Sequence, residues 1–226
     1  MISRFGAVIP AYNELGRIRR AVLDTRSVLG EYADIIVVDD GSTDATAEEA
    51  RTAGARVIAH EMNRGKGAAV KTGALASTSE WILVLDADLS AHPSMLARFL
   101  SHIDTHDIVF GSRRTSGAMI GTQQPWFRVK AGQLFNAFMR AVTGLPYRDT
   151  QCGFKAYRME ACRKLFEQQA VDGWAFDVEL LVQACRRGLR IAEVPVEWSH
   201  VEESKVRLAH GLSILRDLWM IRRNRT

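Results

Sequence analysis

Cysteine and proline are both scarce in this chain. Only 3 cysteines occur among 226 residues, and Cys152, Cys162 and Cys185 are too widely spaced for a zinc site of the CxxC type. Their odd number also argues against a disulfide framework, so we expect free thiols in a reducing compartment. The 5 prolines stand against 47% hydrophobic residues, which excludes a collagen or a disordered chain. The composition predicts one large globular domain, or one domain with a tail.

Long hydrophobic runs are also missing. The strongly apolar stretches, such as Trp81–Leu85, are about as long as a strand, whereas a transmembrane helix needs about 20 apolar residues. Residues 1–10 lead into a strand and lack the basic and apolar regions of a signal peptide. We therefore expect a cytoplasmic protein that contacts a membrane only peripherally.

The charge balance is modest. A formal net charge of +4 is compatible with a partner that carries phosphate. It is too small an excess for the dense basic surface of a nucleic-acid-binding protein, so no nucleic-acid partner is expected.

Short β-branched runs alternate with longer segments of helical periodicity, which predicts an α/β fold with a mostly parallel sheet flanked by helices. The expected strands are residues 5–10, 35–38, 56–59, 81–85, 107–111 and 191–196. The expected helices are residues 14–30, 43–53, 65–77, 93–102, 159–168 and 176–188.

Two further segments have the composition of amphipathic helices. Residues 126–142 and 208–225 each combine apolar or aromatic side chains with several arginines. Either helix could lie at a membrane interface or pack against the domain, and both interpretations stay open. We divide the chain into a catalytic-type α/β domain at residues 1–207 and a basic amphipathic C-terminal helix at residues 208–226.

Polar residues follow four of the predicted strands. The segments are Pro10–Glu14, Asp39–Ser42, Asp86–Asp88 and Gly111–Arg113. In an open parallel sheet, ligands bind beyond the carboxyl ends of the strands, so these segments converge on one candidate site. Each of them alone could instead be a helix cap or a turn.

Asp86 and Asp88 are the candidate metal ligands. In an extended segment, two carboxylates separated by one residue face the same side and can hold Mg²⁺ or Mn²⁺. The sequence contains no HExxH and no P-loop pattern, and no GxGxxG follows the first strand. The pair therefore indicates a cation that bridges a diphosphate and stabilises a departing nucleotide.

Three motifs together carry a resemblance to a known family. Pro10–Glu14, Val38–Asp44 and Asp86–Asp88 resemble the donor half of a family 2 glycosyltransferase with the GT-A fold, a Rossmann-like architecture. Gly111–Arg113 and Asp149–Lys155, with the late Ser204-Lys205 pair, resemble the dolichyl-phosphate and polyprenyl-phosphate hexosyltransferase branch. The resemblance covers nearly the whole chain and implies an inverting, metal-dependent enzyme.

The resemblance implies roles at matching positions. A nucleotide-sugar would contact Pro10, Ala11, Tyr12, Glu14, Val38, Asp40, Lys66, Asp86, Ala87 and Asp88. Asp86 and Asp88 would hold Mg²⁺ or Mn²⁺. Mannosyl relatives commonly carry a glutamine two positions after the second aspartate, where this chain has Ser90.

A lipid-phosphate acceptor requires cations. Arg113, Arg128 and Lys205 are the candidates, although Arg128 could equally be a solvated surface charge. Because such a phosphate is already ionised at neutral pH, positioning and charge would do most of the catalysis. The proposed catalytic residues are Asp88, Arg113 and Asp149, with Asp149 orienting the acceptor or the sugar or, alternatively, capping a turn.

The sugar is predicted from two strings of residues. Gln151–Lys155 and Trp174–Glu179 resemble the glucosyl branch more than the mannosyl branch, so UDP-glucose is favoured over GDP-mannose. The alternatives are a mannosyltransferase, a family 2 enzyme acting on a sugar hydroxyl, and a nucleotide-sugar binding subunit without activity. We also expect peripheral association with the cytoplasmic face of a membrane, with a membrane-anchored partner subunit or a homo-oligomer as further possibilities.

Overall fold

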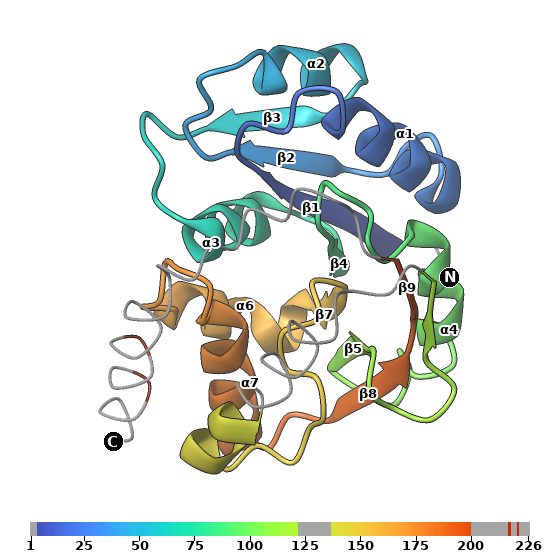
Figure 1. Ribbon diagram of the computed structural model, residues 1–226, viewed down its shortest axis with the longest axis vertical. Helices are drawn as coiled ribbons and strands as arrows, with labels where there is room; N and C mark the ends of the chain where they lie inside the picture. The colour runs from blue at the N-terminus through green and yellow to red at the C-terminus, as the bar shows by residue number, and fades with distance from the viewer. Residues whose placement is uncertain (1–3, 122–136, 200–216, 218–220, 222–226) are drawn as a thin grey trace.

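The computed structural model of the chain describes residues 4–121 and 137–199, together with Asp217 and Ile221 (Figure 1). Its centre is a seven-stranded sheet with the order β3-β2-β1-β4-β7-β5-β8. The strands are β1 (Phe5–Ala11), β2 (Ile35–Asp39), β3 (Arg56–Ala59), β4 (Trp81–Val84), β5 (Ile108–Ser112), β7 (Lys155–Arg158) and β8 (Ile191–Pro195). Neighbouring strands are parallel except where β7 pairs with β4 and β5, so the predicted mostly parallel α/β sheet is confirmed.

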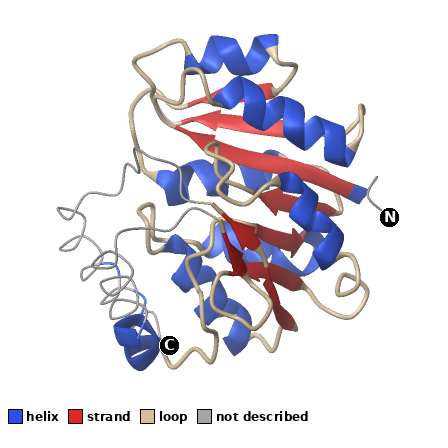
Figure 2. Cartoon of the chain, turned by 45° about the vertical axis from the view of Figure 1, so that its right-hand side comes forward, coloured by secondary structure: helices blue, strands red, loops and turns tan. Residues whose placement is uncertain are grey.

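Helices cover both faces of the sheet (Figure 2). On one face, buried residues of α1 (Ile18–Leu29), α2 (Thr46–Thr52) and α4 (Leu96–Phe99) share a hydrophobic core with the strands. On the other face, α3 (Lys66–Ala76), α6 (Met159–Gln168) and α7 (Phe176–Arg186) contribute to a second core. This two-sided cover leaves the ends of the strands as the place for a site.

The central strands are hydrophobic along their whole length because both faces are covered. All residues of β2 and of β4 are buried. Helix α1 shows the opposite pattern, since Ile18, Val22 and Leu29 are buried while Arg19 and Arg20 are exposed. It ends at Gly30, whose φ of 100° favours glycine.

Three strands were not predicted from the sequence. The antiparallel β7 was missed because its first residue is a lysine, which does not indicate a buried strand. Strands β6 (Met119–Ile120) and β9 (Glu197–Trp198) form a separate two-stranded sheet and are too short to give a periodic pattern. The helix expected at residues 93–102 is shorter than predicted, because a 3₁₀ turn (η2, Pro93–Met95) precedes α4.

The two predicted amphipathic helices are described only in part. Residues 137–143 are helical, and Met139 is buried in the same core as α6 and α7. Ile221 belongs to that core too, and Asp217 is also buried. The described parts of both segments therefore pack on the domain, while the predicted boundary at residue 207 lies outside the described residues. Within the described part of the chain, no helix is both long and apolar enough to cross a bilayer.

Candidate functional site

Hydrogen bonds join the loop that follows β1 to the loop that follows β2. The backbone N–H of Asn13 donates to the Ser42 hydroxyl at 2.9 Å, and the Asn13 side chain accepts the Thr43 N–H at 2.8 Å. Asn13 has a φ of 52°, a left-handed conformation that asparagine tolerates. With these hydrogen bonds in place, the neighbouring Tyr12 side chain is 39% exposed at the carboxyl edge of the sheet. Tyr12 is thus placed where a flat ligand such as a nucleotide base could stack.

Other residues that were predicted to contact the nucleotide-sugar lie around this edge. Pro10 is half-buried, and Ala11 is buried with its carbonyl accepting the Asp40 N–H at 2.8 Å. The Glu14 N–H donates to the Thr46 hydroxyl at 2.8 Å. Val38, the next-to-last residue of β2, is fully buried against α3, and its contact with the nucleotide-sugar stays a prediction.

The Asp40 side chain points into the interior of the protein. Its carboxylate accepts the Arg64 N–H at 3.0 Å and the Gly65 N–H at 2.7 Å, and it contacts Nδ1 of His60 at 2.7 Å. It is only 3% exposed. These contacts hold the turn that leads into α3, so Asp40 positions Lys66, the first residue of that helix.

Asp86 and Asp88 follow β4 in a turn. The Leu89 N–H donates to the Asp86 carbonyl at 3.1 Å, so the expected extended segment is wrong, and the buried Ala87 lies inside the turn. One oxygen of Asp88 accepts the Ser90 N–H at 2.9 Å. The Asp86 side chain is 34% exposed. The turn arises because β4 ends at Val84, where the ladder to β1 and β7 stops.

Gly153 makes room for the Asp86 carboxylate. A Cβ atom on Gly153 would lie 2.1 Å from Oδ2 of Asp86, closer than any real contact. The segment Asp149–Lys155, which the resemblance singled out, therefore packs directly against the candidate metal ligand. Asp86, Ser90, Cys152, Gly153 and Trp198 are among the residues that line a narrow cavity at this contact.

Lys66 forms an ion pair with Asp86. Its Nζ lies 2.5 Å from Oδ1 of Asp86 and 5.3 Å from the ring centre of Trp174. Burial opposes the charge on Lys66, but the nearby carboxylates of Asp86 and Asp177 outweigh it, so the pKa of Lys66 lies above its ordinary value. The predicted donor residue Lys66 is therefore a charged group beside the candidate metal ligand.

A second, deeper ion pair lies behind Lys66. Nζ of Lys155 is 2.8 Å from Oδ1 of Asp177 and also donates to the Cys152 carbonyl. Both side chains are almost completely buried. Burial raises the pKa of Asp177, and the charges of Lys155 and Lys66 offset only part of that effect. The pair ties β7 to the first turn of α7, a helix terminus that favours a carboxylate.

Arg113 and Asp149 form a bidentate pair. The Arg113 guanidinium donates to Asp149 from Nε and Nη2, each at 2.7 Å, and the Arg113 N–H adds a bond of 2.9 Å. Asp149 is 1% exposed. Burial alone would raise its pKa, but the Arg113 bonds and charge hold it below the ordinary value. Asp149 thus fixes the direction of Arg113.

Glu193 on β8 supports this pair from behind. Its carboxylate accepts the Asp149 N–H at 2.8 Å and the Arg148 N–H at 3.0 Å. On the other side, the guanidinium carbon of Arg113 lies 5.4 Å from the ring centre of Trp198. The Arg113 side chain keeps 28% of its surface exposed, so it can still meet a ligand.

The sequence reasoning gave no role to Lys155, Asp177, Glu193 and Trp198. Lys155 and Asp177 belong to the segments Gln151–Lys155 and Trp174–Glu179, yet nothing in one sequence shows that a lysine is buried or which carboxylate it meets. Cys152 is 2% exposed, and burial raises the pKa of its thiol to about 11, so it acts as a small packing residue rather than as a nucleophile.

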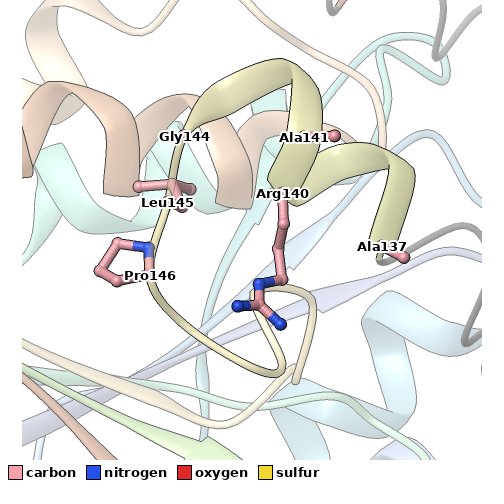
Figure 3. Close-up of a pocket in the computed structure, with 6 residues that line it drawn as sticks. All are labelled: Ala137, Arg140, Ala141, Gly144, Leu145 and Pro146. Atoms are coloured by element: carbon pink, nitrogen blue, oxygen red, sulfur yellow. The ribbon is translucent and has the colours of Figure 1, made fainter.

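Two of the three residues predicted to bind the acceptor phosphate cannot be placed. Arg128 and Lys205 both lie outside the described residues. A separate hollow of about 460 Å³ occurs beside residues 137–146, and Figure 3 shows the Arg140 side chain extending from the helix near the loop with Leu145 and Pro146. It shares no lining residue with the cavity at Asp86.

Asp86 and Asp88 supply only part of the ligand set that a hard divalent cation needs. Within the described residues, no cluster of three or more His, Cys, Asp or Glu side chains could hold a metal alone. Asp86 and Asp88 each have one oxygen that meets a described donor, which leaves their second oxygens as ligands. Two carboxylate oxygens fit Mg²⁺ or Mn²⁺ when phosphate or water completes the shell.

Comparison with known proteins agrees with this geometry. The family model for "Glycosyl transferase family 2" matches residues 7–166. A dolichyl-phosphate beta-glucosyltransferase of Trichomonas vaginalis is 37% identical over 95% of this chain and 69% of its own length. The enzymes of that name from Saccharomyces cerevisiae and Homo sapiens are 33% and 34% identical, over 95% and 97% of this chain and 73% and 75% of their own lengths.

A solved structure shares the fold. Glucosyl-3-phosphoglycerate synthase from Mycobacterium tuberculosis, crystallised with Mn²⁺, UDP-glucose and phosphoglyceric acid, superposes with a TM-score of 0.71 at 24% identity. The match covers 96% of this chain and 77% of that one. The family match spans most of the strands and helices described above, and the chain therefore belongs to glycosyltransferase family 2.

Proposed function

We propose that this protein transfers glucose from UDP-glucose to dolichyl phosphate, with inversion at the sugar carbon. The observation that carries the proposal is the similarity to dolichyl-phosphate beta-glucosyltransferases, at 33–37% identity over 95–97% of the chain. The site supports it because its charged groups suit a diphosphate donor at one end and a phosphate acceptor at the other.

The donor end is built from β1, β4 and α3. Tyr12 offers an exposed ring for the base, while Lys66 and the turn of Asp86 and Asp88 lie where a diphosphate would fit. When bound at Asp86 and Asp88, Mg²⁺ or Mn²⁺ would neutralise negative charge on the diphosphate as it leaves. Lys66 adds a positive charge from the protein itself.

The acceptor end is built around Arg113. In the reaction, a phosphate oxygen of the acceptor forms a bond to the anomeric carbon, while the bond from that carbon to the diphosphate oxygen breaks and its electron pair leaves with UDP. Arg113 can bind the acceptor phosphate because its guanidinium is fixed by Asp149 and partly exposed. Asp149 is a positioning residue here, since its carboxylate is buried and already accepts three bonds from Arg113.

A phosphate acceptor fits this arrangement better than a sugar hydroxyl. A hydroxyl would need a general base, and the carboxylates of Asp149 and Asp177 are both held in ion pairs. A dolichyl phosphate is already an anion and needs orientation rather than deprotonation.

The donor can be tested by the unfolding midpoint. A ligand that binds only the folded protein raises the midpoint by mass action. We expect UDP and UDP-glucose with Mn²⁺ to raise the midpoint, and GDP and GDP-mannose to have a much smaller effect. A shift with guanosine compounds alone would replace the glucosyl proposal by the mannosyl one.

We also propose peripheral binding to the cytoplasmic face of the membrane that holds the lipid acceptor. Met119 and Ile120 on β6 and Phe138 are exposed apolar side chains of the kind that enter a membrane interface. A membrane-anchored partner subunit or a second copy of the chain could supply further attachment. Flotation of the purified protein with liposomes that contain dolichyl phosphate tests direct binding; protein that stays at the bottom of the gradient would contradict it.

A further inference from the structure

Lys66 occupies an unusual place for a positive charge. Its ammonium lies 2.5 Å from Oδ1 of Asp86, the residue proposed to hold a divalent cation. One of the two carboxylate oxygens of this candidate metal ligand is thus already bound by a cation that belongs to the protein. Repulsion between unit charges a few ångströms apart is substantial in a partly buried setting, so Mg²⁺ or Mn²⁺ at Asp86 must act against Lys66.

The surrounding charges determine which cation can move. The cluster contains three carboxylates, Asp86, Asp88 and Asp177, and two ammonium groups, Lys66 and Lys155. Lys155 is 1% exposed and fixed by Asp177 at 2.8 Å. Lys66 is 15% exposed and reaches Asp86 from the first turn of α3. Its flexible stem makes Lys66 the group that can change partners.

A diphosphate gives Lys66 a new partner. Phosphate oxygens beside Asp86 would attract the ammonium through charge-assisted hydrogen bonds. Moving Lys66 from Asp86 to the diphosphate frees a carboxylate oxygen and removes the repulsion against a metal. Each ligand then makes the site better for the other.

We infer that Lys66 is an internal competitor of the divalent cation at Asp86, which makes metal binding depend on the presence of the donor diphosphate. The inference rests on the proposed metal site, and it adds a function to Lys66 beyond contact with the donor. Without donor, the pair of Lys66 and Asp86 keeps the site filled by a protein charge. With donor, the cation and the diphosphate enter together.

The test measures Mn²⁺ binding rather than activity. Electron paramagnetic resonance of free Mn²⁺ gives the dissociation constant for the wild-type protein and for Lys66→Met, each without nucleotide and with UDP. Methionine keeps the apolar stem beside Trp174 and removes only the ammonium. Lys66→Gln serves as a second variant, and unfolding midpoints verify that each protein is folded.

Lys71→Met is the matched control. Lys71 lies on the same helix and its ammonium donates to the Gln169 carbonyl at 2.8 Å, not to Asp86. The control therefore removes the same charge from α3 without freeing a candidate metal ligand. It separates direct competition from a general change in the electrostatic field.

We expect Lys66→Met to bind Mn²⁺ alone about tenfold more tightly than wild type, since an opposing charge next to the ligand is removed. Lys71→Met should stay within about twofold of wild type, because its charge is not paired with Asp86. UDP should strengthen Mn²⁺ binding much more in wild type than in Lys66→Met, after correction for Mn²⁺ bound by free UDP.

Two results would overturn the inference in different ways. If Lys66→Met and Lys71→Met bind Mn²⁺ alone equally, while wild type binds it with UDP, Lys66 does not compete and the metal site itself stands. If no protein binds Mn²⁺ even with UDP, the proposed metal site fails, and the competition fails with it.

Discussion

Asp149→Asn tests whether this carboxylate positions Arg113 or acts as a base. The substitution keeps the shape of the side chain but removes the charge that two guanidinium nitrogens contact at 2.7 Å. Arg113 would lose its fixed orientation and would meet the acceptor phosphate less often. We therefore expect weaker binding of the lipid acceptor and a less stable fold.

The magnitudes follow from burial. Removing one partner of a fully buried ion pair costs about 3–5 kcal/mol. Because 28% of the Arg113 side chain stays exposed to water, we expect a cost below this range, about 2 kcal/mol. In a chain of this size that corresponds to a fall in the unfolding midpoint of about 4–8 °C. Losing the fixed phosphate contact should raise the KM for dolichyl phosphate about tenfold.

Asp107→Asn is the matched control. Asp107 also accepts bonds from two arginines, Arg158 and Arg190, but it precedes β5 and so lies at the opposite end of that strand from Arg113. We expect a similar loss of stability with an unchanged KM. Steady-state transfer kinetics at varied dolichyl phosphate, beside thermal unfolding of both variants, give all the required values.

The positioning role would be refuted by a different kinetic pattern. A general base contributes about 100-fold to 10,000-fold, chiefly to kcat, and its loss removes the acid limb of the pH profile. If Asp149→Asn lowers kcat by that much at an unchanged KM and flattens the pH profile, Asp149 is the base and the acceptor phosphate does not attack unaided.

Three further predictions follow from the packing. Gly153→Ala should displace Asp86, since the new methyl would lie 2.1 Å from Oδ2, and Mn²⁺ binding should fall in a titration that follows free Mn²⁺. Lys155→Met leaves the buried Asp177 carboxylate without this partner and should lower the free energy of unfolding in urea by about 3–5 kcal/mol. Adding Asp177→Leu should recover much of the lost free energy. If the double variant recovers none of it, the pairing is contradicted. Hydrogen bonds from Arg190 and Arg158 outweigh the effect of burial and lower the pKa of Asp107 from 3.8 to about 2. The ionised carboxylate therefore stabilises the fold above pH 3.8, and this stabilisation is lost as the pH falls towards 2. Asp107→Asn should remove about 2 kcal/mol of that pH dependence of the unfolding free energy.

Much of the fold was predictable from the sequence because buried parallel strands are continuous apolar runs. The six parallel strands, β1 to β5 and β8, were predicted to within one residue at each end, although the edge strand β3 is only partly buried. Strand β7 was not, since Lys155 suggests an exposed position. The burial of the Lys155 side chain depends on its ion pair with Asp177, which lies 22 positions later and which no local pattern connects to it. Long-range pairing of charges is not visible in hydrophobic periodicity.

The site was predictable in its location but less so in its contacts. Asp86, Asp88 and Arg113 do follow strands at the carboxyl edge of the sheet, as the topology requires. The partners of Asp40 and Asp149 were not foreseen, because backbone N–H groups and a guanidinium from other elements reach them only after folding. Carboxylates that look like ligands in the sequence can therefore act on the protein itself.

The choice of acceptor distinguishes a lipid-phosphate glucosyltransferase from an enzyme that glucosylates a hydroxyl. Purified protein with radiolabelled UDP-glucose and Mn²⁺ is given dolichyl phosphate or dolichol, which differ only in the phosphate, and label in the lipid fraction is counted. The proposed function requires glucose transfer to dolichyl phosphate, none to dolichol, and loss of transfer in a folded Asp88→Ala variant. Equal transfer to dolichol, or full activity of Asp88→Ala, would contradict it.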